Sequence, residues 1–136
     1  MRTPPVDMLD AAKAVLPNAY APYSHFSVAA CIRTEDGKLF VGCNVENAAY
    51  PLTLCAEANV IGTLYSQGYQ KISEILVLVA DPQICPPCGA CRQRLLECAS
   101  ADTRVHLCAM NGDYESHRLS ALLPFAFGPK NLETTR

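Results

Sequence analysis

The sequence predicts an α/β protein in which a mixed central sheet lies between two layers of helices. Segments with helical periodicity alternate with strand-like segments along the chain. The run from Ile75 to Val79 contains no polar residue, which is typical of a strand covered on both faces. With 136 residues, half of them hydrophobic, the chain can bury a core, so we expect one domain over residues 1–136 with a three-layer α/β/α architecture.

The first half of the chain predicts a helix, a hairpin and a second helix. Residues 6–16 place apolar side chains on one helical face, and Pro17 ends that pattern. Residues 26–33 and 39–44 predict two strands, because Asp36-Gly37 between them is a hairpin turn signal. Residues 55–67 predict a helix that Gly68 closes at its C-terminus.

The second half predicts the remaining strands and two further helices. Pro86 and Pro87 lead into a helix over residues 88–99, since proline is favourable at a helix start. Asn111-Gly112 is a turn between two strands, and Ser120 is expected to cap a last short helix through Leu123. The strands predicted here are residues 72–80, 105–110 and, at an edge, 114–119.

Charge and hydropathy exclude several classes of function. The net charge is -2 and the 11 Lys and Arg residues are scattered, which disfavours nucleic-acid binding and membrane-surface anchoring. No apolar run approaches the roughly 20 residues that span a bilayer, and no signal-peptide pattern follows the first residues, so we expect a cytoplasmic protein and no membrane partner. In a reducing cytosol, the eight cysteines favour metal binding or burial over disulfides.

Three cysteines have the spacing of a catalytic metal site. Cys88 and Cys91 are three residues apart, which places them on one face of the first turn of a predicted helix. Cys55 begins the other predicted helix and can supply a third thiolate. Three protein ligands leave the fourth tetrahedral position of zinc open, as catalytic sites require. The sequence therefore predicts Zn²⁺ held by Cys55, Cys88 and Cys91.

Glu57 follows Cys55 by two residues and is the predicted catalytic residue. A carboxylate beside a metal-activated water can accept its proton and return it elsewhere. A redox pair or half of a structural zinc site would explain Cys88 and Cys91, but neither explains Cys55 together with Glu57. Four other cysteines stand singly within strand or helix patterns and are interpreted as buried thiols: Cys31, Cys43, Cys98 and Cys108.

These motifs together resemble the small cytidine deaminases. The Cys-Ala-Glu followed by Pro-Cys-x-x-Cys is the zinc deaminase pattern with cysteine in place of histidine. The resemblance extends over nearly the whole chain through four more segments: Pro22-Tyr23-Ser24-His25-Phe26, the stretch from Gly42 to Ala48, Leu122-Leu123-Pro124, and Phe127-Gly128-Pro129. It implies a cytidine-deaminase-like fold and the hydrolysis of cytidine and deoxycytidine to uridine and deoxyuridine, a step of pyrimidine salvage.

The resemblance also implies a role for each residue of the site. Cys55, Cys88 and Cys91 would bind zinc, and Glu57 would move a proton from water to N3 of the pyrimidine. The implied substrate-binding residues are Phe26 beside the nucleoside, Asn44 and Glu46 at the ribose hydroxyls, Ala56 at the base edge, and Phe127 stacking from a neighbouring subunit. Asn44 and Glu46 have independent support, because they close a predicted strand and share one side of it.

One departure from the family pattern concerns the charge of the metal site. Family members with three cysteine ligands commonly carry arginine directly after Cys-Ala-Glu, where this chain has Ala58. Three thiolates on Zn²⁺ leave one net negative charge, which such an arginine would offset. We therefore expect Arg92 or the helix dipoles to compensate here.

Two alternative functions and an oligomeric state also follow from these motifs. The first alternative is a deaminase of the same fold that acts on an N4-substituted cytidine or another aminopyrimidine nucleoside. The second is a non-catalytic module stabilised by zinc, and Glu57 argues against it because such a module needs no acid/base group. The resemblance implies a homotetramer with shared active sites. An apolar cluster near the C-terminus supports an intersubunit contact, because such a patch is unusual on a monomer: Leu122, Leu123, Phe125 and Phe127.

Overall fold

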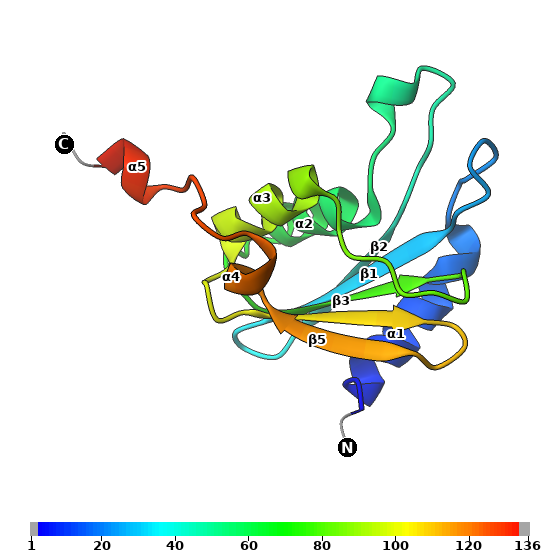
Figure 1. Cartoon of the computed structure of the whole chain (residues 1–136), viewed down its shortest axis with the longest axis horizontal. Helices are drawn as coiled ribbons and strands as arrows, with labels where there is room; N and C mark the ends of the chain where they lie inside the picture. Colours follow the sequence, from blue (N-terminus) through cyan, green and yellow to red (C-terminus); the bar gives the residue numbers. More distant parts are fainter. Residues whose placement is uncertain (1–2, 134–136) are drawn as a thin grey trace.

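The computed structural model describes residues 3–133 and shows a five-stranded mixed sheet with helices on both faces (Figure 1). The strands lie in the order β2-β1-β3-β4-β5, and only β3 and β4 run parallel. This confirms the predicted α/β fold. In chain order the elements are α1 (Val6–Val15), η1 (Leu16–Asn18), β1 (Val28–Thr34), β2 (Leu39–Cys43), η2 (Tyr50–Leu52), α2 (Ala56–Ser66), β3 (Ile72–Val79), α3 (Gly89–Cys98), β4 (Arg104–Ala109), β5 (Tyr114–Arg118), α4 (Leu119–Leu122) and α5 (Lys130–Glu133).

The central strand β3 is buried on both faces, as its unbroken apolar run predicted. Ile75 and Val77 belong to the core cluster that α2 and α3 cover. Leu76 and Leu78 point to the opposite side and pack in a second cluster with Met8 of α1. The two clusters explain the layer order, because each sheet face must be shielded from water by at least one helix.

Strand β1 begins at Val28, so the expectation that it begins at residue 26 is wrong at that end. The side chain of Asn44 accounts for the shift. Its Oδ1 accepts a hydrogen bond from the N–H of Val28 at 3.0 Å, and its Nδ2 donates to the carbonyl oxygen of Phe26 at 2.8 Å. These bonds replace strand pairing before Val28, and Phe26 is left in a loop beside the sheet.

The helix ends differ in detail from the expectations. Gly68 closes α2 as expected, with φ of +89° and hydrogen bonds from Gly68 N to Tyr65 O and from Tyr69 N to Leu64 O. Ser120 does not cap the last predicted helix. Helix α4 begins at Leu119 with Arg118 as its N-cap, two residues earlier than a Ser120 cap implies. Leu119 is buried, and its N–H donates to the carbonyl oxygen of Thr103.

Besides the turn η1 that directly follows α1, two short helical segments were not predicted. Residues 50–52 form the turn η2 at the tip of a projecting loop, and residues 130–133 form α5 on a C-terminal arm that extends away from the sheet (Figure 1). Segments of three or four residues are too short to show a helical period. The arm is kept in shape locally, since the Asn131 side chain accepts a hydrogen bond from the N–H of Gly128.

Gly42 sets how closely α2 approaches the sheet. A Cβ atom at this position would lie 2.8 Å from the backbone nitrogen of Val60 and 3.0 Å from the carbonyl oxygen of Ala56. Because both atoms belong to the backbone of α2, a side chain at residue 42 would push the helix outward. The glycine therefore fixes the position of the helix start that carries Cys55 and Glu57.

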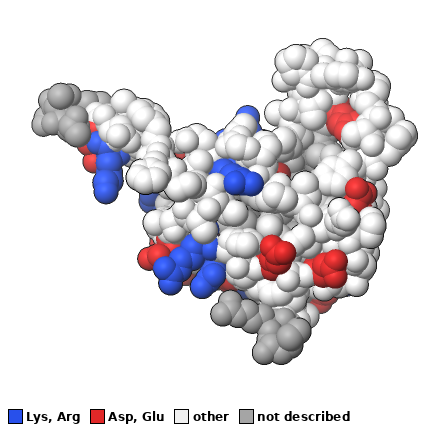
Figure 2. All heavy atoms as spheres, viewed as in Figure 1, with Lys and Arg blue, Asp and Glu red and all other residues white. Residues whose placement is uncertain are grey.

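Charged side chains are dispersed over the surface. Lys, Arg, Asp and Glu lie intermixed in the lower part of the view in Figure 2, and no basic area covers that face. No helix within residues 3–133 is long and apolar enough to span a bilayer. The projecting loop around η2 is nearly free of charge in the same view, and Tyr50 at its tip is 71% exposed.

Candidate active site

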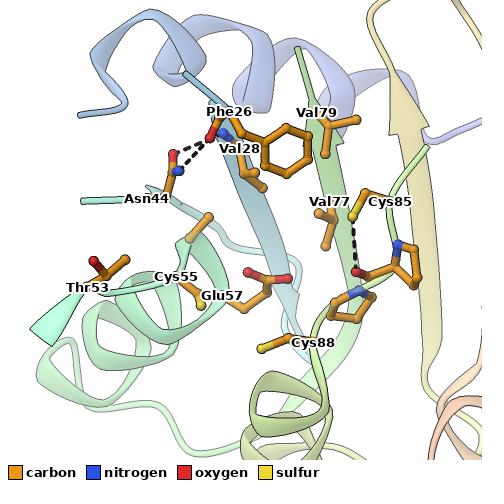
Figure 3. A pocket seen from close by; sticks show the side chains of 13 residues that line it. Phe26, Val28, Asn44, Thr53, Cys55, Glu57, Val77, Val79, Cys85 and Cys88 are labelled. Carbon is orange, nitrogen blue, oxygen red and sulfur yellow. Dashed lines mark hydrogen bonds between the residues drawn. The ribbon is translucent and has the colours of Figure 1, made fainter. Parts of the chain in front are cut away.

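A cavity of about 190 Å³ lies between the starts of α2 and α3 and the adjoining ends of β1 and β3 (Figure 3). Its walls are mainly apolar, with a few polar groups at one end, which is the usual character of a small-molecule site. The lining residues are Phe26, Val28, Asn44, Thr53, Cys55, Ala56, Glu57, Val77, Val79, Cys85, Pro86, Pro87 and Cys88.

The three predicted metal ligands meet at one end of this cavity. Cys55 is the N-cap residue of α2, Cys88 is the N-cap residue of α3, and Cys91 lies in the first turn of α3. Their sulfur atoms all lie within 4.8 Å of one another. Two thiolates bound to one zinc at about 2.3 Å can be at most about 4.6 Å apart, so only small adjustments separate this cluster from a zinc geometry.

The surroundings of the three sulfurs fit a bound cation. Burial raises the pKa of Cys91 and of Cys55. Burial acts on Cys88 as well, but hydrogen bonds outweigh it and lower the pKa of the Cys88 thiol. The largest comes from the backbone N–H of Cys91, followed by the side chains of Cys91 and Cys55 and the backbone N–H of Ala90. Two helix N-termini also point their partial positive charge at the cluster. A soft, tetrahedral, three-thiolate donor set of this kind suits Zn²⁺.

Glu57 lies in the first turn of α2 with its carboxylate in the cavity (Figure 3). It is 5% exposed, and burial raises its pKa. The backbone N–H of Glu57 donates to this carboxylate, but no side chain within the described residues does, so the group can exchange a proton with a ligand. The cavity therefore combines a three-cysteine cluster with a buried acid/base group.

Asn44 lines the same cavity and is 8% exposed. Its two hydrogen bonds to the backbone of Val28 and Phe26 hold the side chain in place. One N–H of the amide remains for a ligand, since the Nδ2 group carries two. Asn44 thus joins the end of β2 to the start of β1 and offers one donor to the cavity.

Glu46 lies outside the main cavity. It lines a neighbouring hollow of about 320 Å³, and Thr53 borders both spaces. One carboxylate oxygen of Glu46 accepts hydrogen bonds from the N–H groups of Tyr23 and Ser24, and the other accepts from the Ser24 hydroxyl. The Ser24 hydroxyl bond is the largest cause of a lowered pKa, so Glu46 stays ionised at neutral pH.

Of the remaining predicted site residues, Phe26 and Ala56 line the cavity and Phe127 does not. Phe127 is 58% exposed on the C-terminal arm. Its carbonyl oxygen accepts a hydrogen bond of 2.8 Å from the Gln93 side chain, two residues after Cys91. The root of the arm is therefore tied to the helix that carries two of the cysteines.

Of the two expected sources of positive charge, Arg92 or the helix dipoles, the structure does not bring Arg92 to a cysteine sulfur, and the helix N-termini remain. The Arg92 guanidinium donates to the carbonyl oxygens of Pro87 and Leu122, which links α3 to α4. The arginine that contacts a ligand sulfur is Arg94, whose Nη1 lies 3.4 Å from Cys91 Sγ. The spacing of three residues between Cys91 and Arg94 is the sequence signal that could have revealed this contact.

Cys85 is a further site residue that the sequence interpretation did not assign. It is half-buried, lines the cavity on the side opposite Asn44, and has a pKa raised by burial (Figure 3). The cysteines interpreted as core thiols are buried, except for half-buried Cys43. Burial raises the pKa of Cys31 to about 12 and that of Cys98 and Cys108 to about 11, which keeps these thiols protonated.

The fold and the site define the class of protein, a zinc-binding deaminase. The family model for the cytidine and deoxycytidylate deaminase zinc-binding region matches residues 5–107. A cytidine deaminase from Halalkalibacterium halodurans is 42% identical over 114 residues, which cover 84% of this chain and 86% of the relative. One from Mycobacterium tuberculosis is 39% identical over 118 residues, with 87% and 85% covered.

A solved structure supports the same assignment. Cytidine deaminase from Burkholderia pseudomallei superposes with a TM-score of 0.86 at 41% identity, and the match covers 92% of this chain and 100% of that one. The chain belongs to the cytidine and deoxycytidylate deaminase family, a family of zinc-binding enzymes.

Proposed function

We propose that this chain catalyses the zinc-dependent hydrolysis of cytidine and deoxycytidine to uridine and deoxyuridine, with release of ammonia. The observation that carries the proposal is the buried Glu57 carboxylate in the same small cavity as Cys55 and Cys88. A structural zinc site has no use for a buried carboxylate to which no side chain of the described residues donates a hydrogen bond. Desolvation of this group costs stability, so a catalytic purpose explains why it is there.

Each residue of the cavity has a defined task in this reaction. Cys55, Cys88 and Cys91 would hold the Zn²⁺, which would supply a water nucleophile by lowering the pKa of water to about 7. Glu57 would accept one proton from the water that attacks C4 and donate it to N3 of the pyrimidine. It would then take the remaining proton from the new hydroxyl on C4 and deliver it to the departing amine, so that the C4–N bond breaks and ammonia leaves. The raised pKa of Glu57 suits this alternation, because proton transfer is most effective when the pKa of the group is near the working pH.

The remaining lining places the nucleoside. The apolar walls formed by Phe26, Val77 and Val79 suit the flat face of a base. A cavity of about 190 Å³ is below the usual range of about 300–1,000 Å³ for ligand pockets, so the ribose extends from it toward the hollow of Glu46. We assign the ribose hydroxyls to Asn44 and Glu46, with the Glu46 carboxylate already oriented by the loop around Ser24.

The active site is completed by a neighbouring subunit of a homotetramer. Phe127 lies on a projecting arm with 58% of its surface exposed, and Phe125 beside it is fully exposed. Aromatic side chains of this size rarely stay in water when a partner surface exists. We assign Phe127 to the open side of a neighbour's cavity, and we place the enzyme in the cytosol, where it serves pyrimidine salvage.

The deciding experiment follows the loss of ultraviolet absorbance on deamination of cytidine and deoxycytidine by the purified protein. Elemental analysis of the same sample should give one zinc per chain, and changing Cys55, Cys88 and Cys91 to Ala should remove the zinc. An N4-methylated cytidine in parallel tests the alternative substrate class. Turnover of that compound but not of cytidine would overturn the proposed substrate, and full zinc binding by the triple variant would overturn the ligand set.

A further inference from the structure

Arg94 is an exposed residue of α3 that contacts one of the proposed zinc ligands, Cys91. Its Nη1 lies 3.4 Å from Sγ of Cys91, which is fully buried. Among the described residues, no carboxylate lies within ion-pair distance of Arg94, in contrast to Arg33 and Arg118. An exposed arginine that directs its guanidinium at a buried sulfur, with no competing anion, is positioned to act on the charge of that sulfur.

The ligand set has a charge that needs an offset. Three thiolates and Zn²⁺ together carry one net negative charge, and the Glu57 carboxylate adds a second charge in the same cavity. Such charges repel each other in a site with little water. The guanidinium of Arg92 is occupied by the carbonyl oxygens of Pro87 and Leu122, so it is not available.

We propose that Arg94 is a positioning residue for the metal centre: its hydrogen bond to Cys91 Sγ offsets the excess negative charge of the three-thiolate site and thereby tightens zinc binding. The inference rests on the proposed ligand set. Hydrogen bonds to a ligand atom commonly tune a metal site, and their loss costs about 10- to 100-fold in metal affinity.

The helical spacing explains why this residue can take the task. Side chains three residues apart on a helix are neighbours, and long side chains point back toward the helix N-terminus. Arg94 therefore reaches Cys91 from within α3. Residue 58 stands in the same relation to Cys55 on α2, but it is Ala58 in this chain and reaches no sulfur. An arginine at residue 58 of α2 or at residue 94 of α3 has this spacing from a cysteine of the cluster, and in this chain only α3 carries one.

The test measures zinc affinity by competition with a chromophoric chelator at constant pH. Arg94→Gln should bind zinc about 10-fold more weakly, at the lower end of the usual range because the arginine is exposed and partly screened. Arg94→Lys should keep part of the affinity. Arg118→Gln removes the same charge from a surface ion pair and should bind zinc like the wild type. The difference between Arg94→Gln and wild type should shrink at high salt.

A rescue experiment separates charge from packing. Ala58→Arg placed in the Arg94→Gln protein supplies a cation from the other helix and should restore most of the zinc affinity. Cobalt-substituted proteins provide a spectroscopic readout, because the thiolate-to-metal absorption bands should shift in Arg94→Gln and return in the double variant. Wild-type affinity in Arg94→Gln, or failure of both Arg94→Lys and the double variant to restore affinity, would overturn the inference. Absence of zinc from the wild-type protein would instead overturn the proposed function.

Discussion

Replacement of Glu57 by glutamine isolates proton transfer from every other property of the site. The two side chains have nearly the same shape, and no side chain in the described part of the chain donates to the carboxylate. The amide cannot accept a proton from water or pass one to the base. Because the three cysteines are untouched, the variant should keep its fold and one zinc per chain.

The expected loss of turnover follows from the position of the carboxylate. Glu57 is 5% exposed and lies in the cavity with the cysteine cluster, so little bulk water can substitute for it. One general acid/base group contributes about 100- to 10,000-fold, and Glu57 serves more than one transfer. We expect kcat to fall by about 10,000-fold or more, which corresponds to about 5 kcal/mol in the activation free energy.

Stability gives an independent check on the same variant. Burial raises the pKa of Glu57 above the value of 4.5 that it has when unfolded, so the folded state holds this proton more tightly. The charged carboxylate therefore lowers the free energy of unfolding at pH above about 4.5. Zinc-free Glu57→Gln should unfold at the same temperature as the wild type or higher.

The role of Glu57 is tested by three measurements on the Glu57→Gln variant: steady-state kinetics with cytidine, zinc content and thermal unfolding. Glu97→Gln is the matched control, since it removes a carboxylate from the exposed surface of α3. The control should keep normal turnover. A Glu57→Gln enzyme within 10-fold of wild-type kcat, with zinc bound, would refute the assigned role.

Four further predictions concern binding and stability. Phe127→Ala should raise KM for cytidine and leave zinc content unchanged; a fully active monomer in sedimentation at assay concentration would contradict the shared site. Asn44→Ala should lower the free energy of unfolding by about 2–4 kcal/mol, because two half-buried backbone groups, Val28 N–H and Phe26 C=O, lose their partner. A urea midpoint of Asn44→Ala equal to that of the wild type would disprove the predicted loss of stability. Gly42→Ala should cost about 1–3 kcal/mol through overpacking against α2, and an unchanged melting temperature would argue against that close approach. Burial raises the pKa of Glu74, but hydrogen bonds from His106 and Arg33 outweigh it and lower the pKa below 4.5. The ionised Glu74 carboxylate therefore stabilises the fold above pH 4.5, and this stabilisation is lost as the pH falls through the lowered pKa of Glu74. The free energies of unfolding of the wild type and of Glu74→Gln should therefore become equal in acid. A constant difference between them over that range would refute the reasoning.

The sequence by itself determined which groups meet at the candidate site and the class of fold. Cys88 and Cys91 are one helical turn apart, and Glu57 is two residues from Cys55, so local spacing places these groups together wherever the two helix starts meet. The unbroken apolar run of β3 likewise indicated a strand covered on both faces. Local geometry and burial need no knowledge of distant contacts, which is why these predictions agree with the structure.

The tertiary structure alone decided which polar groups are already occupied. Asn44 is bonded to the entry of β1, and Glu46 is held by the loop around Ser24, contacts between segments 16 to 22 residues apart. Arg92 bonds to the carbonyl oxygen of Leu122, 30 residues away, and this leaves Arg94 to contact Cys91. A hydrogen-bonding side chain takes the partner that folding brings within about 3 Å, and residue type does not reveal that partner in advance.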